Sequence, residues 1–281
     1  MRFLWVFAHP EPRSLNASLM RDALSTLDGL GHETRTSDLY AMKWKAVVDA
    51  DDFGGEPGDG ERLFVGAAQE HAYASGALSE DIRSELDKLA WADVVVLHFP
   101  LWWFGPPAIL KGWLDRVLVQ GVGFGVKDGA GRTRRYGDGG LAGKRALIVT
   151  SVGARPSGFG PRGIHGSLDE VLFPLLHGTF WYTGMAPLAP FVVYGADRHT
   201  PAEYARTAAA LRARLRALPT AEPLHYHRED GGDYDEDLVL RSGLAPGRTG
   251  LGIHRAAGPS GAREAVRPPA APRPPRRAGS A

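Results

Sequence analysis

The chain has 281 residues, of which 43% are apolar and 23% charged, so it is long enough to bury one substantial core beneath a mixed-charge surface. Its formal net charge of +1 gives no general electrostatic reason to bind nucleic acid or an anionic membrane. The absence of cysteine excludes disulfides, thiolate metal sites and a thiol nucleophile. We expect a globular, cytoplasmic protein without a signal peptide or membrane insertion, whose partners must be inferred from local sites.

Short apolar runs alternate along the chain with longer segments of helical periodicity. This pattern is typical of a parallel β-sheet covered by helices on both faces. The segments with the composition of strands are 3–7, 33–39, 94–99, 146–149 and 191–194. We therefore predict an α/β protein built on a doubly wound, five-stranded parallel sheet.

Helices are predicted between and after these strands. Apolar residues recur at helical spacing in 82–90 and in 110–118, and the second segment follows two prolines. A third helix is predicted over 200–218, because its opening Thr-Pro-Ala-Glu combines an N-cap, a proline at the first helical position and a capping-box acid. It is the last element that the pattern defines.

The chain divides into three parts by composition. Residues 1–218 form the predicted domain, and residues 219–255, with polar clusters and short apolar pieces, form an extension. Residues 256–281 contain six prolines and five arginines against one glutamate, which predicts a disordered tail. Binding of nucleic acid or of an acidic partner by this basic tail is the alternative interpretation, less favoured than a solvated terminus.

Ligands of an open parallel sheet bind beyond the carboxyl ends of its strands, so the loops after the strands are the candidate ligand sites. The first loop, 8–16, leads into a helix whose free amides and positive dipole end suit a phosphate. Ser14 and Asn16 can donate hydrogen bonds there, and His9 and Arg13 can add charge. Neither G-x-G-x-x-G after the strand nor G-x-x-x-x-G-K-[ST] anywhere is present, so a polar N-cap beside a surface histidine is an equally good interpretation.

The second loop, 100–107, follows the most continuously apolar strand and contains three consecutive aromatic residues, Trp102, Trp103 and Phe104. A planar ring can lie against their faces, and Gly105 permits a close approach of the backbone. Aromatic clusters more often belong to a core. At a strand end before a proline-started helix, however, this cluster would fill an interior poorly, which favours a ring-binding site.

The third loop, 150–166, is rich in glycine and hydroxyl groups and carries two arginines and a histidine, as expected of a segment that holds an anion. A reduced flavin is such an anion, with negative charge around N1 and the C2 carbonyl, where amides or a cationic side chain would stabilise it. His165 is the candidate for that side chain. A structural hydrogen bond is its alternative role.

Several separated motifs of the chain occur in the order and spacing of one known family. They are AH (8–9) with SLN (14–16), SDLYAM (37–42), LSEDI (78–82), FPLWWFG (99–105) with PAILKGW (107–113), GIHG (163–166), YTGM (182–185) and HTPA (199–202). Together they span about residues 3–206 and resemble the NAD(P)H:quinone oxidoreductases of DT-diaphorase type, which have a flavodoxin-like fold.

The resemblance implies a bound flavin, FAD or FMN, that passes a hydride from NADPH or NADH to a quinone-like acceptor by ping-pong, two-electron reduction. It also implies a homodimer with the active site at the subunit interface. By their place in the motifs, the diphosphate would face His9, Ser14, Leu15 and Asn16, and Arg13 is a further candidate for cofactor binding from its position in the same loop. The flavin ring would face Pro100, Leu101, Trp102, Trp103 and Phe104, and the pyrimidine side of the ring would face Thr150, Ser151 and Gly153. The acceptor would contact Trp103, Phe104 and Phe124.

The chain departs from the family pattern at several site positions. Phe159 stands where the family has the tyrosine that works with the loop histidine, so His165 would act without that partner. The third loop is one residue longer, with Val152 in place of a glycine. Trp102 stands where glutamine is common and Phe124 where tyrosine is common. The sequence therefore leaves open the acceptor, the choice between NADH and NADPH, and the choice between FAD and FMN.

Three alternatives to this function remain at the level of sequence. The first is a flavin-binding regulatory subunit of a potassium-efflux system, the second a tailoring redox enzyme acting on an aromatic polyketide-type quinone, and the third a binding module that has lost the flavin. The aromatic loop, with Ser14 and Asn16, argues against the third. No metal is predicted, because the ten histidines do not fall into a ligand spacing.

Overall fold

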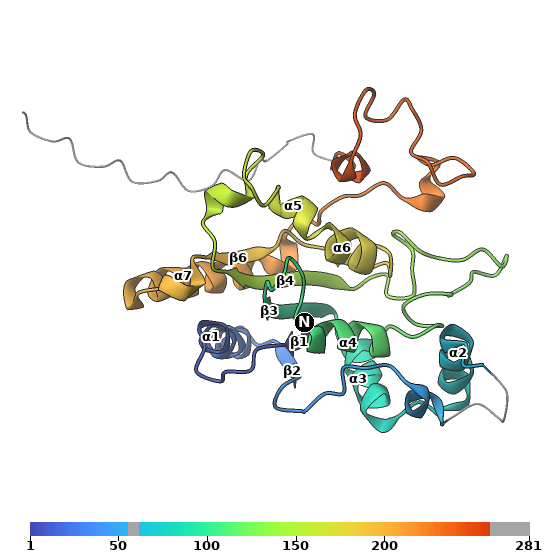
Figure 1. Cartoon of the computed structure of the whole chain (residues 1–281), viewed down its shortest axis with the longest axis horizontal. Helices are drawn as coiled ribbons and strands as arrows, with labels where there is room; N and C mark the ends of the chain where they lie inside the picture. The colour runs from blue at the N-terminus through green and yellow to red at the C-terminus, as the bar shows by residue number, and fades with distance from the viewer. Residues whose placement is uncertain (56–61, 259–281) are drawn as a thin grey trace, which may run out of the picture.

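A parallel β-sheet lies between two layers of helices in the computed structural model, which describes residues 1–55 and 62–258 (Figure 1). The strand order is β2-β1-β3-β4-β5, with β6 also paired to β4, and this is the order of a flavodoxin-like sheet. The strands are β1 (Arg2–Phe7), β2 (Glu33–Asp38), β3 (Val94–Pro100), β4 (Arg145–Val152), β5 (Ala186–Pro187) and β6 (Phe191–Tyr194).

All five predicted strands are confirmed, but the last position in the sheet holds two short strands. β5 pairs with the beginning of β4, at Arg145 and Ala146, and β6 pairs with its last four residues. The break between them contains Pro190, and Pro187 ends β5. Because proline has no N–H to donate, this edge cannot form one continuous ladder.

The helices are α1 (Leu15–Gly29), α2 (Val65–Ser75), α3 (Glu80–Trp91), α4 (Ala108–Val117), α5 (Leu168–Val171), α6 (Phe173–Leu175) and α7 (Pro201–Ala217). The three helices predicted over 82–90, 110–118 and 200–218 correspond to α3, α4 and α7. The capping box of α7 is present, since Thr200 Oγ1 accepts from Glu203 N at 3.3 Å and Glu203 Oε2 accepts from Thr200 N at 2.7 Å. α2, α5 and α6 were not predicted.

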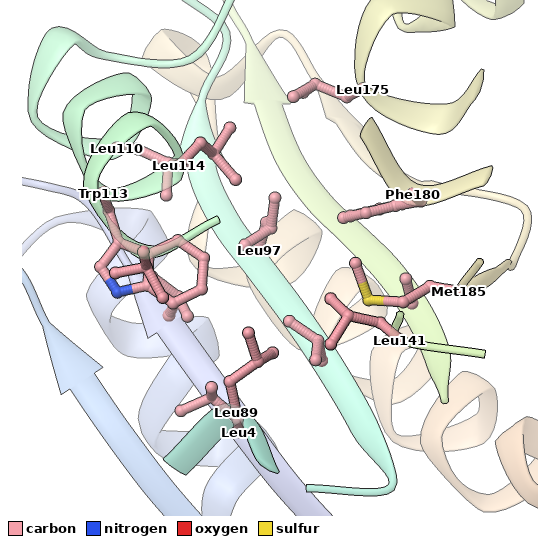
Figure 2. Packing of buried hydrophobic residues seen from close by; sticks show 14 of the residues in the cluster. Leu4, Leu89, Leu97, Leu110, Trp113, Leu114, Leu141, Leu175, Phe180 and Met185 are labelled. Carbon is pink, nitrogen blue, oxygen red and sulfur yellow. The ribbon is translucent and has the colours of Figure 1, made fainter. Parts of the chain in front are cut away.

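Alternate residues of the strands form two separate cores. Phe3, Trp5 and Phe7 of β1 pack against α1 and α7 on one face of the sheet. Leu4 faces the opposite layer, which α3, α4 and the segment 172–180 provide (Figures 1 and 2). Burial on both faces explains why the central strands are continuously apolar.

The C-terminal extension lies against this second layer. Leu224 N donates to the carbonyl of Pro187 in β5 at 2.7 Å, and Tyr226 is buried beside Phe173. The predicted disordered tail falls almost entirely on residues 259–281, outside the part of the chain that the structure describes. Across residues 1–55 and 62–258, the structure contains no helix that is both long enough and apolar enough to cross a membrane.

Candidate active site

The carboxyl ends of the central strands meet at one edge of the sheet. Phe7 of β1 pairs with His98 of β3, Pro100 of β3 pairs with Ser151 of β4, and β6 pairs with the end of β4. The three loops selected from the sequence therefore converge, and the segment after β6 joins them. This is the edge at which ligands of such sheets bind.

A cavity of about 320 Å³, called here the polar cavity, lies between these loops. It brings together every predicted cofactor-binding residue except Arg13, Trp103, Phe104 and Thr150. Its lining consists of His9, Ser14, Leu15, Asn16, Pro100, Leu101, Trp102, Ser151, Gly153, Ala196 and Asp197.

The first loop provides hydrogen-bond donors to the polar cavity. Ser14 caps α1, since its Oγ accepts from Ala17 N at 3.1 Å, which leaves the hydroxyl proton for another acceptor. His9 Nδ1 accepts from Glu11 N at 3.0 Å, so the proton of the neutral ring lies on Nε2. Burial lowers the pKa of His9 and favours this neutral form. With the free amides at the start of α1, these groups suit an anion.

Asp197 also lines the polar cavity and was not predicted from the sequence. A Cβ added at Gly153 would come within 2.4 Å of its Oδ2 atom, so the backbone of the third loop and this carboxylate are closely opposed. A carboxylate accepts hydrogen bonds from hydroxyl groups and repels phosphate. The signal that could have identified Asp197 is its place directly after β6, on a fourth strand-end loop.

Of the four predicted residues that do not line the polar cavity, Arg13 and Thr150 belong to the first and third loops. Arg13 is exposed and its Nε pairs with Glu11 Oε1 at 3.2 Å. Thr150 is buried within β4, and its Oγ1 has no hydrogen-bond partner among the described residues. The roles assigned to these two residues remain predictions.

The second loop forms a tight turn with a strained backbone. Trp102 and Gly105 exchange two hydrogen bonds of 3.0 Å, and Trp103 and Phe104 between them have φ values of 49° and 61°. Positive φ at both central positions is the geometry of a type I′ turn, which normally holds asparagine and glycine. The side chain of Trp103 is 98% exposed and that of Phe104 53% exposed. Bulky residues in this conformation are costly, which points to function in this aromatic turn, residues 102–105.

A second cavity, of about 330 Å³, is lined by Phe104 and Gly105 of the aromatic turn and is called here the apolar cavity. Phe104 and Phe124, both predicted to contact the acceptor, line it, whereas Trp103 lines neither cavity. Most of the rest of its lining comes from α4 and from the segment 171–183, including Leu114, Leu172 and Tyr182. The YTGM motif at the end of this segment was identified from the sequence, but the lining of a cavity by the segment was not predicted.

The third loop places His165 against two aromatic rings. Its ring centroid lies 4.9 Å from that of Phe159 and 5.7 Å from that of Phe104. The loop is tightly folded, since His165 N donates to Gly158 O at 3.0 Å and a Cβ at Gly158 would lie 2.7 Å from the imidazole Cδ2. The two predicted catalytic positions, His165 and Phe159, are therefore in contact with each other, and His165 also contacts Phe104 of the aromatic turn.

The described residues contain no cluster of three or more histidine, cysteine, aspartate or glutamate side chains that could hold a metal ion. His225 and His227 have separate partners: His225 Nε2 pairs with Glu222 at 2.7 Å and His227 Nδ1 with Asp233 at 2.7 Å.

Comparison with known proteins shows which family the chain resembles. The family model of the flavodoxin-like fold matches residues 1–217. A ribosyldihydronicotinamide dehydrogenase-like protein from Penicillium crustosum is 44% identical over 258 residues, covering 90% of this chain and 95% of that protein. NAD(P)H dehydrogenase (quinone) 1 of Rattus norvegicus is 34% identical over 225 residues, covering 80% of each. A Klebsiella pneumoniae structure described as a quinone reductase has a TM-score of 0.87 and 45% identity, covering 91% of this chain and 100% of that one.

The chain belongs to the NAD(P)H:quinone oxidoreductase family. It is therefore an oxidoreductase, and the fold and family predicted from the motifs are confirmed. Within this family, the polar cavity and the aromatic turn are the parts of the chain that could hold a redox cofactor.

Proposed function

We propose that the protein is a flavin-dependent oxidoreductase that uses NADPH or NADH to reduce a quinone or a related aromatic acceptor by two electrons. The observation that carries the proposal is the junction of the polar cavity with the aromatic turn: donors suited to a phosphate lie directly beside exposed aromatic faces. A flavin has both kinds of group in one molecule. FAD is the preferred form, with FMN as the alternative.

The donor chemistry of the polar cavity fits the cofactor. Ser14, Asn16 and the amides at the start of α1 would hold phosphate oxygens, and His9 would donate through Nε2–H. Asp197 suits the hydroxyl groups of a ribityl or ribose chain. When bound, the flavin would supply the capacity to accept a hydride and pass it on.

The aromatic turn and the third loop would position the reacting groups. Trp102 lines the polar cavity and Phe104 the apolar cavity, so the turn would separate the bound cofactor from the acceptor. His165, packed on Phe104 and Phe159, would stabilise negative charge near the ring without a tyrosine partner.

A second copy of the chain would complete the site. The side chains of Trp103 and Ile164 are 98% and 92% exposed although they flank the proposed ring site. Exposed apolar side chains around a cavity are typical of an interface. A homodimer in sedimentation analysis would support this part of the proposal, and a monomer at micromolar concentration would contradict it.

The identity of the hydride donor needs a direct comparison. The rat relative is an NAD(P)H dehydrogenase by name, whereas the Penicillium crustosum relative is named for ribosyldihydronicotinamide. NADPH, NADH and dihydronicotinamide riboside should therefore be tested side by side. We expect NADPH or NADH to serve as the hydride donor. If only dihydronicotinamide riboside supports reduction of the acceptor, this choice of donor is wrong.

The decisive experiment is the absorption spectrum of the purified protein, followed anaerobically while NADPH and then menadione are added. We expect a flavin spectrum that bleaches with NADPH and recovers with menadione. Reduction without menadione, followed by reoxidation in a separate step, is the order that ping-pong transfer requires. A colourless protein that cannot be reconstituted with FAD or FMN would overturn the proposed function.

A further inference from the structure

A chain of buried side-chain hydrogen bonds connects the middle of β1 with the polar cavity. Trp5 Nε1 donates to His98 Nδ1 at 3.3 Å, and His98 Nε2 lies 3.2 Å from Asn16 Oδ1. Asn16 Nδ2 in turn donates to Ser151 Oγ at 2.9 Å. Trp5 and His98 are fully buried, and Asn16 and Ser151 are 4% exposed. The four residues come from β1, β3, α1 and β4 and are called here the buried relay.

The indole of Trp5 gives the buried relay one direction. An indole N–H can only donate, so His98 Nδ1 must accept, and the proton of the neutral imidazole then lies on Nε2. That proton is donated to Asn16 Oδ1, which turns the amide nitrogen of Asn16 toward Ser151. Every hydrogen bond therefore donates toward the polar cavity.

The buried relay ends in groups that can bind an anion. Asn16 and Ser151 line the polar cavity, and Trp5 and His98 do not. The second N–H of the Asn16 amide and the hydroxyl proton of Ser151 donate to no protein acceptor among the described residues. Hydrogen bonds from donors that are held in place before the ligand arrives are the effective ones in an anion site.

The position of His98 is unusual for a structural residue. It occupies the single polar position in the otherwise apolar strand segment Val94–Pro100, between the rings of Trp5 and Phe7. Burial lowers its pKa to about 3, so the ring stays neutral with one donor and one acceptor nitrogen. An apolar residue would fill this space at less desolvation cost, but it could not orient Asn16.

We propose that His98 is a positioning residue for the phosphate subsite, with its tautomer set by Trp5, and that it aims the Asn16 amide at a phosphate group. The proposal rests on the proposed function in one respect, the identification of that phosphate as part of a flavin. It predicts that His98 affects the binding of phosphorylated ligands and leaves the binding of the flavin ring itself unchanged.

The first test measures binding of riboflavin, FMN and FAD to the apoprotein by fluorescence quenching. For His98→Leu we expect Kd for FMN and FAD to rise about 10- to 100-fold, while Kd for riboflavin changes less than about threefold. His98→Gln should recover most of the affinity, because one amide carries both the acceptor and the donor. Trp5→Phe should give an intermediate loss, because the donor that sets the tautomer is removed.

A matched control separates positioning from general destabilisation. Trp113 is also buried, and its Nε1 donates to Glu85 Oε2 at 2.7 Å in the opposite core. Trp113→Phe should lower the melting temperature without changing the ratio of FMN to riboflavin affinity. The proposal would be overturned if His98→Leu lowered the affinity for riboflavin, FMN and FAD equally. It would also be overturned if Trp113→Phe lowered the ratio of FMN to riboflavin affinity as much as His98→Leu does.

The second test does not depend on flavin binding. Asn16 is the only asparagine in the chain, so selective ¹⁵N labelling of asparagine gives one side-chain amide to observe by NMR. Titration with inorganic phosphate should shift this amide in the wild-type protein and in His98→Gln, and not in His98→Leu. No shift in the wild type would overturn the proposal. If phosphate shifts the Asn16 amide signal but the protein binds no flavin, the positioning role of His98 is supported and the proposed function is wrong.

Discussion

The polar and apolar cavities are lined by different residues of one four-residue turn and are built in different ways. The polar cavity is formed at strand ends, where the register of β1, β3 and β4 fixes the backbone and a buried relay fixes the side chains. The apolar cavity is formed by side chains from α4, from Phe124 and from the segment 171–183, which are held by packing.

This difference predicts how selective each cavity is. Buried donors with fixed directions discriminate strongly, because a ligand without the matching acceptor leaves them unpaired. A hydrophobic cavity discriminates weakly, since one methylene changes binding by only about 1–3 kcal/mol. We therefore expect the polar cavity to require one kind of cofactor and the apolar cavity to accept a range of aromatic rings.

The largest effect is expected for Asn16→Asp. The substitution keeps the shape of the side chain but replaces a donor with a carboxylate in the polar cavity, so affinity for FMN and FAD should fall more than about 100-fold. Equilibrium titration of the apoprotein measures this.

Gln69→Glu is the control for that substitution, because Gln69 is an equally buried amide, 4% exposed, outside both cavities. It should reduce stability and leave flavin affinity within about threefold. Retention of FAD affinity by Asn16→Asp would show that the polar cavity is not the phosphate site.

The next effect concerns stability against pH in the two regions. Burial lowers the pKa of His98, beside the polar cavity, to about 3, and that of His177, behind the apolar cavity, to about 4. Both are neutral in the folded chain but become protonated in the unfolded chain below about pH 6.5, so stability falls as pH falls. Between pH 7 and 5, each should lower the free energy of unfolding by about 2 kcal/mol.

Urea unfolding at these two pH values tests the pH effect. In His98→Gln and in His177→Gln, the decrease in the free energy of unfolding between pH 7 and 5 should be smaller by the contribution of the histidine removed. If neither variant flattens the dependence, the groups responsible lie elsewhere.

A smaller effect is expected for Trp103→Gly in the aromatic turn. Glycine relieves the positive φ of 49°, which should increase stability by about 1 kcal/mol. The same change removes an exposed aromatic face, so quinone turnover should drop about tenfold. Thermal melts test the expected gain in stability, and steady-state kinetics test the expected loss of quinone turnover. A loss of stability with unchanged turnover would contradict the functional role of the turn.

The smallest effect is expected for His165→Gln. Because His165 contacts Phe104 of the apolar cavity and lines neither cavity, flavin retention should not change. The rate of flavin reduction by NADPH, measured by stopped flow, should fall about three- to fivefold because the imidazole beside the ring site is lost. An unchanged rate and pH profile would leave His165 with a structural role only.

The sequence predicted the polar cavity better than the apolar cavity for a physical reason. Apolar runs in the sequence predict the strands, and a parallel arrangement places the loops after these strands at one edge of the sheet. Ser14, Asn16 and Ser151 could therefore be grouped from the sequence. Asp197 obeys the same rule and was missed only because the loop after β6 was not considered.

Other features depend on contacts that no local pattern reveals. His98 is visible as a polar residue in an apolar strand, but its role requires the pairing of β1 with β3, which places Trp5 beside it. The contact of Phe124 with the 171–183 segment involves loops and short helices without regular periodicity. The positive φ values of Trp103 and Phe104 oppose the preferences of those residues, so propensity alone predicts a different turn.

The divided edge of the sheet has a consequence for how the protein behaves in a crowded solution. An open strand edge offers unpaired N–H and C=O groups to other chains and invites aggregation. Here Pro187 and Pro190 have no N–H group, and the carbonyl of Pro187 already accepts a hydrogen bond from Leu224 N of the extension. The residues after α7 thus act as a built-in cover for the edge, and a chain shortened at residue 218 would expose it to its neighbours.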